Sequence, residues 1–145
     1  MGRARRSFRG RALLALAAGL GVACGEDPRA VVEGPDGARR LLVHVQVART
    51  AAERVQGLRG AESLAEDAGL WIAFPGEDEV CIVNEGVGFP IDALFVRADA
   101  VVEAVEAAIP AGDATPRCHR AEAVLEVAAG VAAAVRPGDR ATLRE

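Results

Sequence analysis

Alternating apolar and polar positions predict a domain built mainly of β-strands. Between Leu41 and Ala48 one face carries Leu41, Val43, Val45 and Val47, which is typical of a half-buried strand. A continuous apolar run at Leu70–Phe74 predicts a strand buried on both faces, and Pro75-Gly76 predicts a turn after it. Further strands are expected at Val80–Val83, Ile91–Arg97, Val101–Ile109, Ala123–Val127 and Ala141–Leu143.

Two short helices are expected beside these strands. Thr50-Ala51-Ala52-Glu53 is a capping box, in which the Thr50 hydroxyl accepts from the Glu53 amide and the Glu53 carboxylate reaches back. This helix should run to about Gln56 and end at Gly57. Ala129–Val135 predicts one or two further helical turns. The predicted class is α+β, with a mainly antiparallel or mixed sheet that curls toward a barrel.

The first 23 residues have the layout of an export signal. Five arginines and no acidic residue are followed by a small-apolar run, Ala12–Ala23, which is too short to span a bilayer. Leu20-Gly21-Val22-Ala23-Cys24 resembles the lipobox of bacterial lipoproteins, which implies a lipid anchor on the Cys24 sulfur. The alternative is an ordinary signal with a free thiol at Cys24. Arg5-Arg6-Ser7-Phe8 also resembles a twin-arginine export motif, although a generic basic head explains it equally well.

Composition divides the rest of the chain into a tether and one domain. Residues 24–39 are rich in Gly, Pro and charge, and predict an anchor followed by a flexible tether. Residues 40–145 are expected to form a single β-rich domain.

Charge limits the classes of partner. The whole chain has a net charge of −4, and removal of residues 1–23 would leave 12 basic against 21 acidic residues, a net charge of −9. Such an acidic domain lacks the basic face that nucleic-acid binding needs. It also gains nothing from anionic lipid, so any membrane attachment is expected through Cys24.

Two cysteines remain within the predicted domain. Export would place Cys81 and Cys118 where disulfides persist, so we expect a bond between them. The alternative is two buried thiols that act as small hydrophobic side chains.

Several segments, in order, resemble one family, the domain of unknown function 192 (DUF192). The segments that carry the resemblance are Thr50–Leu58, Gly69–Phe74, Phe89–Val96, Val124–Gly130 and Arg136–Asp139. The resemblance implies a compact, largely β domain with short helices, and export signals are common in the family. It implies no established activity.

The chain departs from the family pattern in two places. An aromatic-Met-Lys-Asn stretch is usual where this chain has Ile82–Gly88, and Arg59 stands where the family pattern has Met. If the stretch lines a family site, that site is altered here.

Three charged residues in or near apolar segments are candidates for a polar pocket. Asp92 and Glu126 lie inside apolar strands, where a carboxylate is costly unless it is paired, and Arg54 lies in the capped helix. The functional interpretation is that the three converge on one pocket. The structural alternative is that Asp92 accepts backbone amides near Gly86–Gly88 and Arg54 pairs with a carboxylate.

Other chemistry finds little support in the sequence. His44 and His119 are the only histidines, and the adjacent pair Cys118-His119 lacks the spacing of a zinc site, so no metal is expected. No phosphate-binding glycine motif is present, so no cofactor is expected, and Trp71 is expected in the core.

These observations predict a lipid-anchored, periplasm-facing envelope domain that binds a small ligand or a partner protein. One alternative is a hydrolytic enzyme that uses Asp92 and Glu126. It requires both carboxylates at one cleft, and fails if they lie on opposite faces of the sheet. Another alternative is a cytoplasmic or secreted domain with a structural role.

Overall fold

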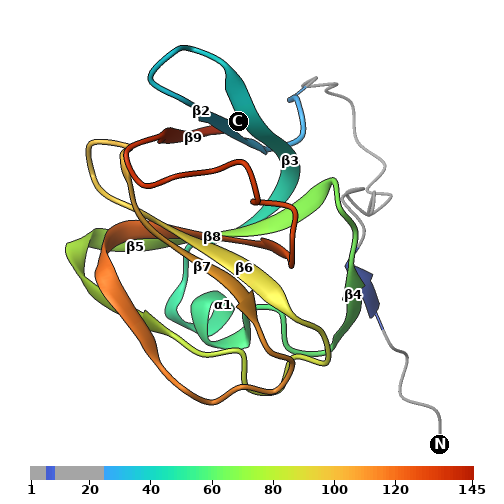
Figure 1. The fold of residues 1–145 in the computed structure, drawn as a ribbon. Coiled ribbons are helices and arrows are strands. Elements are labelled where there is room, and N and C mark those ends of the chain that lie inside the picture. Colours follow the sequence, from blue (N-terminus) through green and yellow to red (C-terminus); the bar gives the residue numbers. More distant parts are fainter. Residues whose placement is uncertain (1–5, 9–24) are drawn as a thin grey trace, which may run out of the picture.

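A computed structural model describes residues 6–8 and 25–145 (Figure 1). Most of the predicted export signal, and Cys24 itself, lie outside these residues. Within them, no helix is long and apolar enough to cross a membrane. The elements are β1 (Arg6–Phe8), β2 (Arg29–Glu33), β3 (Arg39–Ala48), α1 (Ala51–Gln56), β4 (Ala61–Leu64), β5 (Ala68–Ile82), β6 (Ile91–Val96), β7 (Val102–Ile109), β8 (Arg117–Ala128) and β9 (Arg140–Arg144).

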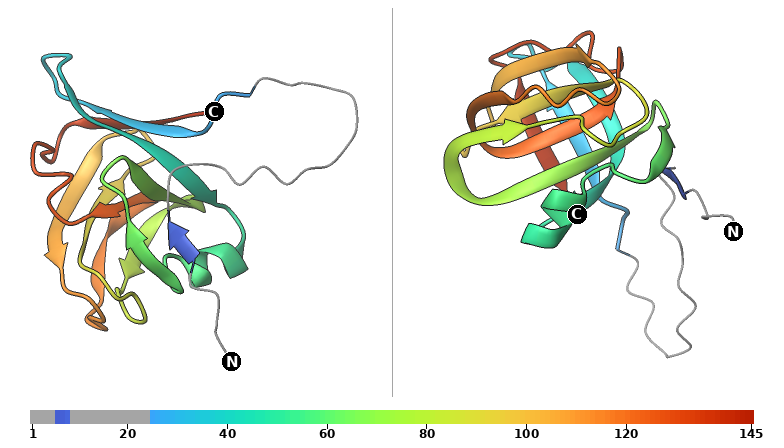
Figure 2. Two further views of the ribbon diagram at one scale, coloured as in Figure 1. Left: turned by 90° about the vertical axis from the view of Figure 1, so that its right-hand side faces the viewer. Right: turned by 90° about the horizontal axis from the view of Figure 1, so that it is seen from below.

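Seven strands form one mixed sheet in the order β7-β6-β8-β5-β3-β2-β9. Within this seven-stranded sheet, β3 and β5 are the one parallel pair, and all other neighbouring strands are antiparallel. The sheet curls into a half-barrel (Figure 2), and a bridge between Val101 and Arg140 brings its two edge strands together at one end. The predicted curled, mainly antiparallel sheet is therefore confirmed. A separate pair joins β4 in parallel to β1, which lies within the predicted export signal.

Apolar side chains cover both faces of the sheet. One cluster includes Trp71, Leu94 and Leu125, and the other includes Ile72 and Phe95. Because side chains alternate along a strand, neighbouring residues of β6 enter different clusters. Strand β6, between β7 and β8, is accordingly buried along its whole length.

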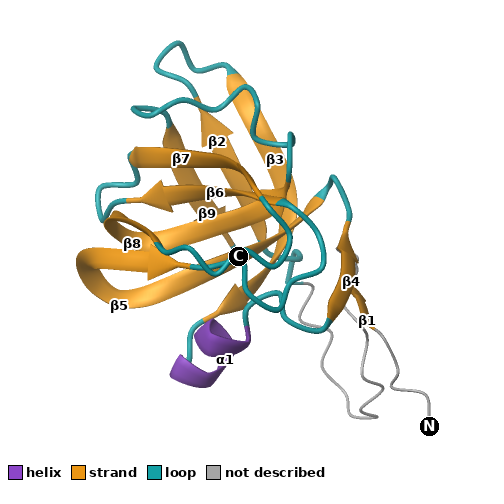
Figure 3. Ribbon diagram, turned by 60° about the horizontal axis from the view of Figure 1, so that its bottom comes forward, coloured by secondary structure: helices purple, strands orange, loops and turns teal. Residues whose placement is uncertain are grey.

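The first predicted helix forms as expected. The Glu53 amide donates to the Thr50 hydroxyl at 3.1 Å, and the Glu53 carboxylate accepts from the amides of Arg49 and Thr50. Gly57, with φ of 49°, ends the helix. Figure 3 shows this helix beside the β5 side of the sheet.

Two local predictions are wrong. The expected second helix at Ala129–Val135 is a series of turns, so α1 is the only helix in the described part of the chain. The expected turn at Pro75-Gly76 lies inside β5, which continues to Ile82. The register with β8 jumps between Ala73 and Asp78, so β5 bulges where a turn was predicted.

The sheet also takes up part of the segment predicted as a tether. Strand β2 lies between β3 and β9, and Ala30, Val31 and Val32 are buried. A turn at residues 35–37 joins β2 to β3. Charged residues flank this short apolar run, so the composition of the segment did not indicate a strand, although the run is long enough to form one.

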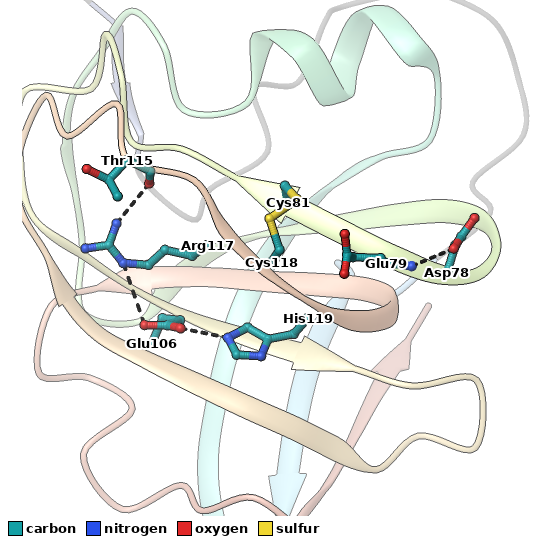
Figure 4. Close-up of a disulfide and its surroundings, with 8 residues drawn as sticks. All are labelled: Asp78, Glu79, Cys81, Glu106, Thr115, Arg117, Cys118 and His119. Carbon is teal, nitrogen blue, oxygen red and sulfur yellow. Dashed lines mark hydrogen bonds and ion pairs between the residues drawn. A yellow bond between two sulfur atoms is a disulfide. The ribbon is translucent and has the colours of Figure 1, made fainter.

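The expected disulfide joins Cys81 of β5 to Cys118 of β8 (Figure 4). The two residues are direct partners across the antiparallel pair, with Cα atoms 4.0 Å apart. Strand pairing therefore holds the sulfur atoms together at an exposed position on the sheet.

We predict that removing this bond destabilises the domain. The bond closes a loop over a sequence separation of 37 residues, which limits the freedom of the unfolded chain. The double variant Cys81→Ser/Cys118→Ser should lower the free energy of unfolding by about 2–4 kcal/mol in urea denaturation. An unchanged free energy of unfolding, or two reactive thiols in unreduced wild-type protein, would contradict this account.

Candidate functional site: a pocket with a buried carboxyl group

A cavity of about 430 Å³ lies between α1, the segment after it, β5 and β8. Its walls are largely apolar. Among the apolar side chains that line it are Leu58, Ile72, Phe74, Ile82 and Val87. Four lining side chains carry strongly polar groups, and they are Arg54, Arg59, Asn84 and Glu126. A mainly apolar cavity with a few polar groups is the usual form of a small-molecule site.

Glu126 places a buried carboxyl group in this pocket. Glu126 is only 5% exposed, and no described residue donates a hydrogen bond to its carboxyl group. Burial raises the pKa of this carboxyl to about 7, and the nearby charge of Arg59 lowers it to a smaller degree. Glu126 therefore changes its protonation state near neutral pH.

Strands β5 and β8 approach closely beside Glu126. Gly69 of β5 lies against the Glu126 backbone, where an added Cβ atom would come within 2.9 Å of the Glu126 carbonyl oxygen. The glycine therefore permits a backbone approach that other residues would oppose.

Asn84 contributes a second unsatisfied acceptor. The residue is 1% exposed, and its amide nitrogen donates to the carbonyl oxygens of Phe89 and Pro110 at 2.9 and 3.0 Å. These two bonds fix the orientation of the side chain. Its Oδ1 atom has no partner among the described residues. A buried polar atom without a partner is costly, so a ligand donor at this point would stabilise the site.

The two arginines of the pocket are held by backbone carbonyl groups. Arg54 donates to the carbonyl oxygens of Arg49 and Ala73 and lies over the ring of Phe74, 5.6 Å from its centroid. Arg59 donates to the carbonyl oxygen of Val55. Neither arginine forms an ion pair with Glu126.

Asp92 does not belong to this pocket. Its carboxylate accepts from the backbone amides of Ala108, Gly130 and Ala132 at 2.8, 2.9 and 3.1 Å. It thereby gives a hydrogen-bond partner to two amides of the turn that follows β8 and to one amide of β7. This matches the structural alternative in kind, although the amides are not those of Gly86–Gly88.

The sheet register separates the two candidate carboxyl groups. Asp92 is opposite Val127 and Glu126 is opposite Ala93 across the β6–β8 pair. Directly opposite residues share a face and adjacent residues alternate, so Asp92 and Glu126 lie on opposite faces. The structure brings Arg54 and Glu126 to one pocket and leaves Asp92 on the other side of the sheet.

Sequence reasoning did not select Asn84 or Arg59 as site residues. Both lie where the chain departs from the DUF192 pattern, Asn84 within Ile82–Gly88 and Arg59 after Leu58. The structure brings these two departures together around one pocket. Those departures were the available signal for this site.

The described residues contain one group with the spacing of metal ligands, formed by Glu79, Cys81 and Cys118. Both sulfur atoms are joined in the disulfide, which leaves one carboxylate as a ligand. His119 instead contacts Glu106, with 2.7 Å between Nε2 and Oε1 (Figure 4). The adjacent residues Cys118 and His119 therefore make separate contacts, Cys118 with Cys81 and His119 with Glu106.

The described residues form a mostly β domain that contains a ligand-sized cavity. A family profile matches residues 32–143, and the chain belongs to the DUF192 family (Uncharacterized ACR, COG1430). No curated protein matches the chain.

Two solved structures have a similar fold. A protein of unknown function from Novosphingobium aromaticivorans is 28% identical, with a TM-score of 0.74, over 88% of this chain and 94% of that one. A putative transcription regulator from Sinorhizobium meliloti is 24% identical, with a TM-score of 0.75, over 79% of this chain and 92% of that one. The latter similarity shows the fold alone.

We predict that Glu126 makes the domain less stable as pH rises through neutrality. Between the ordinary pKa of 4.5 and about 7, the unfolded carboxyl is ionised while the folded one keeps its proton. The folded state then binds more protons, so raising the pH favours unfolding. Glu126→Gln should resemble wild type near pH 4.5 and exceed its free energy of unfolding by up to about 3 kcal/mol near pH 8.

Urea denaturation across this pH range measures the difference. Glu122→Gln, which removes a half-buried carboxyl from the same strand, is the control and should show no such gain. Parallel pH profiles for wild type and Glu126→Gln would show that Glu126 does not titrate abnormally.

Proposed function

We propose that this protein is a non-enzymatic binding domain that takes a small molecule into the pocket beneath α1. The observation that carries the proposal is a largely apolar cavity lined by the buried residue Glu126 and by Asn84, whose buried Oδ1 atom has no partner among the described residues. A folded domain retains such costly groups most readily where a ligand satisfies them.

We favour binding over a hydrolytic mechanism in which two carboxylates act together. Asp92 and Glu126 lie on opposite faces of the sheet and cannot act on one substrate. Three backbone amides also donate to the Asp92 carboxylate, so Asp92 has a structural role. Glu126 alone remains in the pocket, where it can pair with a ligand group.

The second part of the proposal concerns location. We propose that residues 1–23 direct export and that a lipid on Cys24 holds the domain at the envelope, facing the periplasm. The basic head, the short apolar run and the lipobox-like Leu20–Cys24 support this. The disulfide at Cys81 and Cys118 is in keeping with an oxidising compartment.

Blocking the pocket should abolish ligand binding. Ala51 is exposed and lines the cavity, whereas its neighbour Ala52 is exposed and does not. We predict that Ala51→Trp fills the entrance and weakens binding at least about 10-fold, while Ala52→Trp binds like wild type. Protein-observed NMR titrations with phenylbutylamine, phenylbutanol and phenylbutanoate measure the affinities.

At least one of the three probes should shift the amide signals of residues around the pocket. Proposed binding fails if none shifts them in wild type. It also fails if Ala51→Trp and Ala52→Trp have equal affinities for every probe. Thermal unfolding of both variants checks that each is folded.

The proposed anchor has its own test. In cells of the source organism given radiolabelled fatty acid, wild-type protein should gain label in a globomycin-sensitive manner, and Cys24→Ser should gain none. Envelope fractionation should place the labelled protein with membranes. Unlabelled protein in the cytosol that still begins at Met1 would contradict both export and anchoring.

A further inference from the structure

We propose that the pocket selects organic cations, meaning molecules with an ammonium group and an apolar body, with Glu126 as counterion and Asn84 Oδ1 as second acceptor. This inference rests on the proposed function and specifies the ligand class of the same site.

The hydrogen-bonding groups of Asn84 and Glu126 favour a ligand that is rich in hydrogen-bond donors. Asn84 uses its amide nitrogen on two backbone carbonyls, so only its oxygen is free. The ionised Glu126 carboxylate offers acceptors only. An ammonium group has three N–H donors and no acceptor, which complements both residues. A carboxylate ligand could accept from Arg54 and Arg59, but it would bring a second negative charge beside the ionised Glu126.

The charges around the pocket set a further condition. Arg54 and Arg59 are the charged groups that face the cavity from α1 and the segment after it. Their guanidinium groups are tied to the carbonyl oxygens of Arg49, Ala73 and Val55. Burial raises the pKa of the Glu126 carboxyl more than the charge of Arg59 lowers it, and no described residue forms an ion pair with it. A bound ammonium group would supply a close countercharge.

The apolar body of the ligand would occupy the rest of the cavity. Leu58, Phe74 and Val87 offer apolar contacts, and about 430 Å³ accommodates a phenyl ring with a short alkyl chain. Phenylbutylamine therefore represents the proposed class. Phenylbutanol and phenylbutanoate keep the same body but replace the ammonium group with a neutral or anionic group.

Binding of the cation should release a proton near neutral pH. Below about pH 7 the free Glu126 carboxyl holds its proton, and the ion pair forms when that proton passes to solvent. The other charged groups that line the pocket are Arg54 and Arg59, and β5 adds no titrating group to the lining because Cys81 is in the disulfide. Affinity for the amine should therefore rise with pH.

The expected change follows from the ionised fraction of Glu126. That fraction rises from about 3% near pH 5.5 to about 97% near pH 8.5, for a pKa of about 7. The amine stays protonated over this range, so its affinity should rise about 30-fold. Isothermal titration of full-length protein with phenylbutylamine at both pH values measures the change.

Two variants separate the contributions of the charges. Glu126→Gln keeps the shape of the side chain, and should bind the amine at least about 10-fold more weakly at pH 8.5 with no rise between the two pH values. Arg59→Gln removes a repelling charge and should bind the amine more tightly. The Arg59 variant keeps the inference testable even if Glu126→Gln fails to fold.

The inference is overturned if phenylbutanol or phenylbutanoate binds as tightly as the amine near pH 8.5. It is also overturned if Arg59→Gln weakens amine binding, or if wild-type affinity for the amine does not rise with pH. These results would leave the proposed binding function intact with another ligand class. Failure of all three probes to bind would instead overturn the proposed function itself.

Discussion

The burial of the Glu126 carboxyl group, with no hydrogen-bond donor for it among the described residues, is the constraint on which the functional account depends. Asp92 shows the contrasting solution within the same sheet. Three backbone amides satisfy its carboxylate, which consequently serves the fold. Glu126 has no such donors in the described part of the chain, and burial raises its pKa instead. Two buried acids only one strand apart thus have different roles because their hydrogen-bonding surroundings differ.

Several local features cooperate to keep the pocket open beside Glu126. The Thr50–Glu53 capping box fixes the start of α1, and Arg54 ties that helix to the carbonyl oxygen of Ala73 in β5. On the other wall, Asn84 holds the chain after β5 through Phe89 and Pro110. The cavity therefore lies between two elements that are each anchored to the backbone, so it is defined before any ligand arrives.

The sequence predicted the features that depend on local chemistry. The capping box and the alternation in β3 follow from spacing within a few residues, and both form. The bulge in β5 was missed because Pro75-Gly76 resembles a turn, whereas the strand continues and its pairing with β8 resumes at Asp78. The face of Glu126 relative to Asp92 depends on cross-strand register, which no single strand encodes. Asn84 likewise becomes notable only because folding buries its oxygen without a donor.

The central claim is that Glu126 is a desolvated carboxyl group that titrates near neutrality in the free protein. A carbon-detected NMR titration of glutamate side-chain carboxyl signals, with Glu126→Gln used to assign the signal, measures this directly. The account predicts a midpoint at about pH 7 for Glu126. A midpoint near the ordinary value of 4.5 would mean that water or an unrecognised donor stabilises the carboxylate. The basis for both the binding proposal and the selection of cations would then be lost.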